Sequence, residues 1–374
     1  MIAGASITQD EAFARIRLLR SPNVGPVTYA ALLARFGSAA AALEALPDIA
    51  ARGGRPYRPA SEARIAEEVA GVKRAGARYL FHDSPDYPPL LREAEGAPPI
   101  LVARGVPAIA AGPAIAIVGA RNASAAAIKL AREFGTGLAE AGYTVVSGLA
   151  RGIDGAAHRG AMSAGSSGGG TIGVIASGID IAYPPEHADL QEAIANDGLL
   201  LAEQPLGTEP LARHFPARNR IIAGIAAGTL VVEAAPKSGS LITARLAGGM
   251  GREVMAIPGS PLDSRSRGCN NLIREGAILV QDVGDVIELL TDFAGQPRST
   301  FRETPSEHYG SDEMLAQEPA DIAGLLTTAP VAVDELIRQS GQGAAAIQLA
   351  LLELELAGRL VRHAAGRVSL VGGA

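Results

Sequence analysis

The sequence predicts an α/β protein in which a domain built on a parallel sheet follows a helical module and precedes a winged helix. Three observations lead to this prediction. Short apolar runs alternate with helical patterns between Ile100 and Leu290. Most of these runs are continuously apolar, as expected of strands that helices cover on both faces. Glycine-rich turns repeatedly join a strand to the next helix, where backbone amides can face an anion.

The apolar runs place the strands of this sheet at 114–118, 143–146, 171–176, 199–202, 229–233, 253–257 and 277–280. A chain of 374 residues has room for two or three domains. We expect a helical module at 1–84, the parallel-sheet domain at 85–294, a linker at 295–316 and the winged helix at 317–374.

Residues 11–46 predict short helices joined by a turn at Asn23-Val-Gly-Pro26. This pattern resembles the helix-hairpin-helix and sterile-alpha-motif-like (SAM-like) modules. Such a turn can contact a DNA backbone through its amides, although a structural packing role suits it at least as well.

The C-terminal region begins with a polar stretch at 295–316 that is rich in Pro, Ser, Thr and Glu, which predicts a linker. Three helical patterns and a hairpin follow it, and together they predict the winged helix. We expect the third helix to expose Glu353 and Glu355, so that it repels a phosphate backbone and suits protein contact better than base reading.

The composition sets the class of protein. Hydrophobic residues make up 48% of the chain and the formal net charge is −6, which argues against a surface coated in positive charge but leaves room for a local basic groove. Cys269 is the only cysteine, so no internal disulfide forms and a reduced cytoplasmic setting is expected. Neither a signal peptide nor a membrane span is evident.

The stretch Ser147-Gly-Leu-Ala-Arg-Gly-Ile-Asp154 is the most informative feature. It joins a predicted strand to a predicted helix, and its candidate anion-binding residues are Ser147, Gly148, Arg151 and Gly152. Asp154 and His158 share one helix face, which suits an acid/base pair or two metal ligands. A hydrogen bond that locks the loop fits better because no third ligand stands nearby. Arg151 has two interpretations, a phosphate contact or a pair with Asp154.

Gly119 and Arg121 follow the predicted strand at 114–118. The G-x-G-x-x-G spacing is incomplete and no acidic residue ends the second strand, so a nicotinamide dinucleotide is not expected. The alternative makes Gly119 a tight turn and Arg121 a solvated surface residue.

The densest basic cluster contains an aromatic residue, and its candidate DNA-binding members are Arg213, Phe215, Arg218, Asn219 and Arg220. Guanidinium groups that hold phosphates beside a ring that stacks a base suit single-stranded nucleic acid. The alternative packs Phe215 in the core and pairs one arginine with Glu233.

A fourth turn begins another helix and resembles a phosphate cradle, with Lys237, Ser238, Gly239 and Ser240 as candidates. The Walker spacing, a His-Glu-x-x-His helix and paired cysteines do not occur in the sequence, and no Gly-x-Ser-x-Gly stretch directly follows a predicted strand as a nucleophile elbow requires. We therefore expect no catalytic activity, no cofactor and no metal. Because these turns follow parallel strands, they should gather at the carboxyl edge of one sheet, where several phosphate-holding turns suit a polymer.

Several long motifs together resemble the DNA-processing protein A family (DprA, also called Smf). The resemblance is strong over about residues 85–290 and is carried by five stretches: Ile117-Val-Gly-Ala-Arg121, 146–158, Phe215-Pro-Ala-Arg-Asn-Arg220, 232–244 and Ile257-Pro-Gly259. It implies an extended Rossmann-like domain that binds single-stranded DNA, with Arg121, Arg218 and the Phe215 region lining the groove. Ala120 stands where relatives often carry Ser or Thr.

The resemblance also implies a role in natural transformation, in which the protein protects incoming strands and loads the RecA recombinase onto them in the presence of single-strand-binding protein. It further implies a homodimer formed through the Rossmann-like domain. Two alternatives compete with this function. A phosphoribohydrolase-like nucleotide-processing enzyme needs an acidic residue that the stretch 237–245 lacks. A winged-helix transcription regulator needs basic or amide groups near the start of its reading helix, where Gln348 alone is available.

Overall fold

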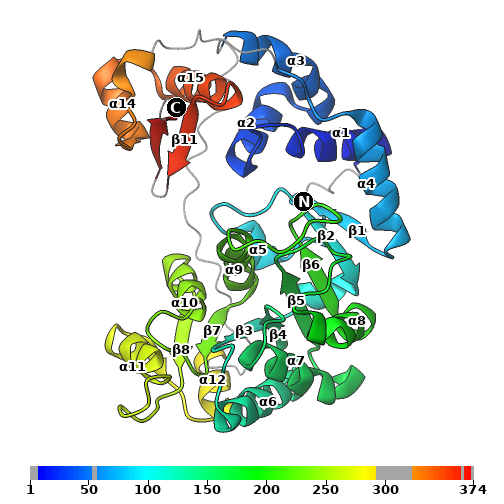
Figure 1. Ribbon diagram of the computed structural model, residues 1–374, viewed down its shortest axis with the longest axis vertical. Coiled ribbons are helices and arrows are strands. Elements are labelled where there is room, and N and C mark those ends of the chain that lie inside the picture. The colour runs from blue at the N-terminus through cyan, green and yellow to red at the C-terminus, as the bar shows by residue number, and fades with distance from the viewer. Residues whose placement is uncertain (1–6, 53–56, 292–321, 364–365, 372–374) are drawn as a thin grey trace. The chain divides into compact units, whose positions relative to one another are not determined.

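The computed structural model describes residues 7–52, 57–291, 322–363 and 366–371 (Figure 1). The predicted linker at 295–316 lies outside these residues. The chain divides into two compact units. One runs from Glu68 through the parallel sheet, and the other combines the helices before Glu68 with the C-terminal winged helix.

A nine-stranded sheet forms the centre of the larger unit, in the order β1-β2-β6-β5-β4-β3-β7-β8-β9. All pairs from β6 to β9 are parallel, which confirms the predicted fold class. The seven predicted strands are β3 (Ala114–Val118), β4 (Thr144–Ser147), β5 (Thr171–Ile175), β6 (Leu199–Ala202), β7 (Gly228–Val231), β8 (Glu253–Ala256) and β9 (Ile278–Leu279). Two antiparallel strands that the sequence did not predict, β1 (Arg78–Phe81) and β2 (Ile100–Gly105), extend the sheet beyond β6.

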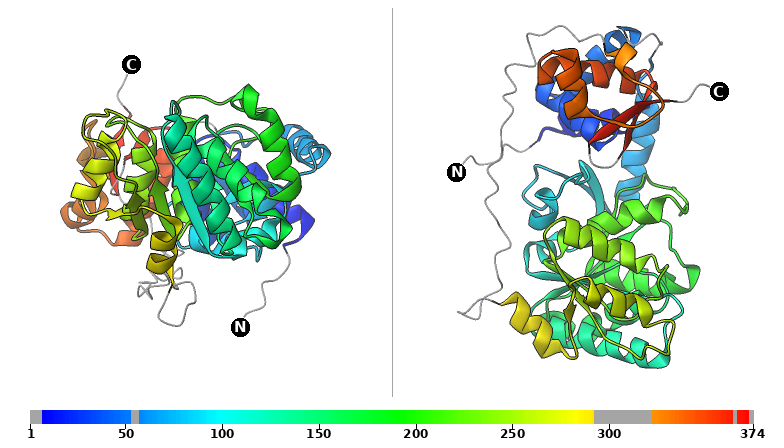
Figure 2. Two further views of the ribbon diagram at one scale, coloured as in Figure 1. Left: turned by 90° about the horizontal axis from the view of Figure 1, so that it is seen from below. Right: turned by 90° about the vertical axis from the view of Figure 1, so that its left-hand side faces the viewer.

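Helices cover both faces of this sheet (Figure 2). One face carries α6 (Ala125–Glu140), α7 (Ile153–Ser163), α8 (Ala188–Asp197) and α12 (Val283–Leu290). The other carries α5 (Pro89–Arg92), α9 (His214–Ile225), α10 (Ser240–Gly249) and α11 (Arg267–Arg274). The alternating residues of β3 show this arrangement, since Ile115 and Ile117 pack on the first face while Ala116 and Val118 pack on the second.

The strand order reverses at β3. Successive connections run from β3 outward to β6, and the chain then returns to place β7 on the other side of β3. The carboxyl ends of β3 and β7 thus flank a topological switch point, the place where open α/β sheets bind ligands.

The smaller unit holds two helical modules. The N-terminal module comprises α1 (Gln9–Leu19), α2 (Pro26–Phe36) and α3 (Ala39–Arg52), and the boundary between the two units falls within the next helix, α4 (Glu62–Arg74). The winged helix comprises a 3₁₀ turn (Ala323–Leu325), β10 (Val331–Ala332), α14 (Val333–Ser340), α15 (Ala344–Leu356), β11 (Leu360–His363) and β12 (Arg367–Leu370). Among the described residues no single helix is long and apolar enough to cross a membrane, although the bent pair formed by 26–36 and 39–51 passes that test by length and composition.

The expectation that the third helix of the winged helix exposes two glutamates is wrong. Glu353 is only 9% exposed, and the Glu355 carboxylate accepts from Arg362 Nε at 2.9 Å. The reason is that α15 is apolar and covered around most of its circumference.

Candidate nucleic-acid interface

The turns after β3, β4 and β7 meet at the carboxyl edge of the sheet. A Cβ atom added at Gly152 would lie 2.3 Å from the Ala120 carbonyl oxygen. One added at Gly119 would lie 2.5 Å from Ile153 Cγ1 and 3.0 Å from the carbonyl oxygen of Glu233. Glycine at these two positions therefore lets three chain segments approach within van der Waals contact.

Glu233 fixes the turn that carries Arg121. Its carboxylate accepts from the Ser124 amide at 3.0 Å and from the Ser124 hydroxyl at 2.7 Å. Its carbonyl oxygen accepts from the Ala120 amide at 2.7 Å. Ser124 in turn caps α6 by accepting from the Ala127 amide. The alternative in which an arginine of the basic cluster pairs with Glu233 is wrong, because the Glu233 carboxylate binds Ser124. Arg220 of that cluster forms its ion pair with Glu203.

Arg218 is buried beneath Gly148. Arg218 is only 6% exposed, and its Nη1 atom donates to the Val174 carbonyl at 3.3 Å. A Cβ atom at Gly148 would lie 1.3 Å from the same Nη1 atom. Only glycine leaves the guanidinium this space, so Gly148 is required by the position of Arg218.

Asp154 lies at the buried end of the same arrangement. Burial raises the pKa of its carboxyl, while Arg218 and the amides of Ala150 and Gly148 favour the charged form. The Gly148 amide donates to Asp154 Oδ2 at 3.1 Å, so Asp154 locks the loop as the sequence argument favoured. Burial lowers the pKa of Arg218 to about 10, which keeps it protonated at neutral pH.

His158 is not a partner of Asp154. Its Nδ1 atom lies 2.7 Å from the Thr171 hydroxyl, which donates its own proton to the Val145 carbonyl. His158 Nδ1 is therefore the donor, and the ring is neutral because burial lowers the pKa of His158 to about 3. This histidine belongs to the core.

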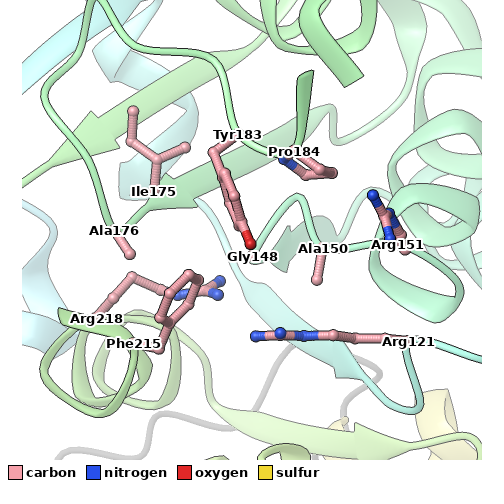
Figure 3. A pocket seen from close by; sticks show the side chains of 10 residues that line it. All are labelled: Arg121, Gly148, Ala150, Arg151, Ile175, Ala176, Tyr183, Pro184, Phe215 and Arg218. Carbon is pink, nitrogen blue, oxygen red and sulfur yellow. The ribbon is translucent and has the colours of Figure 1, made fainter. Parts of the chain in front are cut away.

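Two guanidinium groups lie near the ring of Phe215. Arg121 Cζ lies 5.1 Å and Arg218 Cζ 5.9 Å from the centroid of its ring, both within cation–π range. The ring of Tyr183 lies 5.7 Å away with a tilt of 58°. These four side chains line one small pocket, whose volume is about 60 Å³. Figure 3 shows them pointing toward one another.

A larger groove of about 660 Å³ adjoins this pocket along the switch point. It brings together nine of the residues chosen from the sequence: Gly119, Arg121, Phe215, Arg218, Asn219, Lys237, Ser238, Gly239 and Ser240. Gly148 and Arg151 line the small pocket beside it. Arg121 and Lys237 are exposed there, so the open part of the groove carries positive charge.

Four of the chosen residues line neither cavity. The Ser147 hydroxyl faces the sheet and donates to the Ile117 carbonyl at 2.6 Å. Gly152 supports the turn at φ 73°, Arg220 binds Glu203, and Arg213 is exposed just before α9. Arg151 pairs with Glu186 and not with Asp154.

Among the lining residues that were not chosen from the sequence, Tyr183 adds an aromatic ring and Arg265 adds a positive charge. Tyr183 comes from the loop after β5, where an aromatic residue ahead of Pro184-Pro185 was the available signal. Arg265 lines the groove from the segment after β8, which the sequence reasoning did not single out.

Comparisons with known proteins identify the family of this chain. The family described as DNA recombination-mediator protein A matches residues 78–291, a DprA-like N-terminal HHH domain matches 9–71 and a DprA winged helix domain matches 307–366. The chain belongs to the DNA recombination-mediator protein A family, as the sequence motifs predicted.

Two relatives illustrate the range of similarity. Protein Smf of Escherichia coli is 37% identical over 312 residues, which cover 82% of this chain and 81% of the relative. Protein Smf of Synechocystis is 42% identical over 207 residues, which cover 54% of this chain and 51% of that relative.

Two solved structures share the fold. The DNA processing protein A structure from Streptococcus pneumoniae has a TM-score of 0.62 and 37% identity, covering 76% of this chain and 98% of its own. The second structure, from Helicobacter pylori, is described as giving insight into a single-stranded DNA binding mode of DNA processing protein A. It has a TM-score of 0.51 and 27% identity, and the match covers 57% of this chain and 95% of the Helicobacter pylori chain.

Proposed function

We propose that this protein binds single-stranded DNA along the groove between β3 and β7, protects incoming strands during natural transformation and loads the RecA recombinase onto them. The observation that carries the proposal is the groove itself. It lies at the switch point, carries exposed Arg121 and Lys237, and is lined in part by Phe215. The described Helicobacter pylori relative supports the choice of a single strand as ligand.

The chemistry of the groove suits a flexible polyanion. Arg121 and Lys237 are exposed on turns at the edge of the sheet and offer positive charge to successive phosphates. The Phe215 ring offers a face on which a base stacks, which tolerates any sequence. A stiff duplex keeps its bases inside the helix and gains nothing from the ring.

The remaining parts of the proposal concern the whole protein. We place it in the cytoplasm as a homodimer that acts without cofactor, metal or catalytic turnover, in contact with RecA and with single-strand-binding protein. The proposal predicts that RecA assembles faster on strands precoated with single-strand-binding protein when this protein is present. A stopped-flow measurement of RecA ATPase onset reports the effect.

The direct test compares single-stranded and duplex oligonucleotides of equal length by fluorescence anisotropy at matched salt. We expect tighter binding to the single strand, little dependence on its sequence, and affinity that falls as salt rises. Equal or tighter binding to the duplex would overturn the proposed ligand.

A further inference from the structure

The third helix of the winged helix, α15, has two apolar faces. Ile347, Leu351 and Leu354 join the core of the winged helix itself. On the other side, Leu349 and Leu352 belong to the hydrophobic cluster of the N-terminal helices. A helix that is apolar all round needs a partner on each side, and α15 has one on each.

The second apolar face of α15 is almost fully buried. Leu349 and Leu352 are each 2% exposed and Leu356 is 1% exposed. They share their cluster with fully buried Leu32 of α2 and Leu46 of α3. Burying side chains of this size contributes about 1.5–3 kcal/mol each relative to exposure.

A directed hydrogen bond accompanies this packing. Asn23, in the turn between α1 and α2, donates from Nδ2 to the Leu356 carbonyl oxygen at 3.1 Å. The last carbonyls of a helix lack intrahelical partners, so the Asn23 amide caps the C-terminus of α15. Asn23 has φ 59°, a left-handed conformation that asparagine tolerates better than most residues.

The two elements that meet here, α15 and the turn at Asn23, belong to motifs that in other proteins contact DNA. A winged helix of the helix-turn-helix type reads DNA with such a helix, and a helix-hairpin-helix module approaches the backbone with such a turn. Here α15 carries no Lys or Arg and includes Glu353 and Glu355. Its outer face is apolar and contacts protein.

We propose that the partner of the winged helix is the N-terminal helical module of the same chain, so that α1–α3 and the winged helix form a single clasp. In this clasp α15 is a protein-contact element and does not read DNA. The turn at Asn23 caps α15 instead of presenting its side chain to a phosphate. This proposal does not depend on the ligand of the groove in the other unit.

Hydrogen exchange of the full chain tests the clasp, with Leu352→Glu on the buried outer face of α15 and Gln348→Glu on its exposed side as the matched control. We expect Leu352→Glu to speed amide exchange in α2 and α3 about tenfold, roughly 1.4 kcal/mol of lost protection. Gln348→Glu and the strands of the parallel sheet should exchange as in the wild type. Unchanged exchange in α2 and α3 of Leu352→Glu would overturn the clasp.

A second variant distinguishes loss of this contact from unfolding of the winged helix itself. Asn23→Gly lies outside the winged helix, keeps the left-handed conformation and removes only the amide that donates to Leu356. Faster exchange in α15 of this variant supports the clasp, and wild-type exchange there contradicts the capping contact. Diluting the wild type a hundredfold should change nothing, whereas loss of protection on dilution would show that a second copy supplies the partner and would overturn the same-chain assignment.

Discussion

Arg121 and Arg218 contact the same phenylalanine ring but differ in burial. Arg121 is exposed at the groove, whereas Arg218 is 6% exposed and stabilises a buried carboxylate. Sequence reasoning treated both as charge contacts at turns, because a motif shows which residues are near one another and not which is covered. From this difference in burial we propose that Arg121 contacts a phosphate and that Arg218 positions the residues around it.

Arg218→Ala should destabilise the larger unit. The substitution removes the charge that favours the ionised form of Asp154 and the donor to the buried Val174 carbonyl, and the lost hydrogen bond alone costs about 2 kcal/mol. Denaturant unfolding followed by circular dichroism measures the change, with exposed Arg274→Ala of α11 as the control. A variant as stable as the control would return Arg218 to the role of a surface contact.

Gly148→Ala should lower stability by about 2 kcal/mol or more, since the added methyl would occupy the space of the Arg218 guanidinium. Gly249→Ala is the control, because nothing lies within 4 Å of a Cβ at that position. Equal melting temperatures of the two variants would show that Arg218 moves away at little cost.

His158 predicts an acid-sensitive core. Its pKa falls from 6.5 to about 3 on folding, so the unfolded chain binds a proton that the folded chain refuses. The resulting stability is complete above pH 6.5 and is lost as the pH falls toward 3, amounting to about 2 kcal/mol by about pH 5. Chemical denaturation near pH 7.5 and near pH 5 should show a smaller decrease for His158→Asn than for the wild type. The same decrease in both would assign the acid sensitivity to other groups.

At the scale of elements, the seven parallel strands were predictable because helices cover both of their faces, which leaves continuous apolar runs in the sequence. The antiparallel strands β1 and β2 were not predicted. β1 has only four residues, which run from exposed to buried and do not alternate, so no strand periodicity marks it. A proline-rich passage separates β1 from β2, so no tight turn marks the pair either. The meeting of the turns was predicted from the parallel sheet, but the covering of Arg218 by Gly148 depends on tertiary contacts.

The turn after β3 should depend on Glu233. In Glu233→Gln one oxygen still accepts from Ser124 while the new amide group cannot accept from the other donor. We expect single-strand affinity to fall about threefold, roughly 0.7 kcal/mol, through the displaced Arg121, with the fold intact. Exposed Glu275→Gln is the matched control. Wild-type affinity in Glu233→Gln would show that the turn holds its position without this carboxylate.

At the scale of the whole molecule, the sequence predicted a winged helix but not its partner. The leucines at 349, 352 and 356 fit a winged-helix core equally well on sequence grounds, and only the fold shows that they face the N-terminal helices. The two ends of the chain are far apart in sequence, so no local pattern could indicate the contact.

A chain ending at residue 291 tests whether single-strand binding needs the winged helix. It keeps the groove, so we expect single-strand affinity within about tenfold of the full chain at matched salt. It loses α15, so the N-terminal helices should exchange amide protons faster. A larger loss of affinity with the parallel-sheet unit still folded would make the winged helix a DNA-binding element.

The central claim is that exposed charge in the groove between β3 and β7 holds the phosphates of a single strand. The most direct measurement is the salt dependence of single-strand affinity for the wild type, Arg121→Ala and Arg78→Ala, the last being an exposed arginine on β1 that pairs with Asp86. Removing one phosphate contact should lower affinity and reduce the slope of log K against log salt by about 0.7 in Arg121→Ala, while Arg78→Ala keeps both wild-type values. Wild-type affinity and slope in Arg121→Ala would contradict the claim.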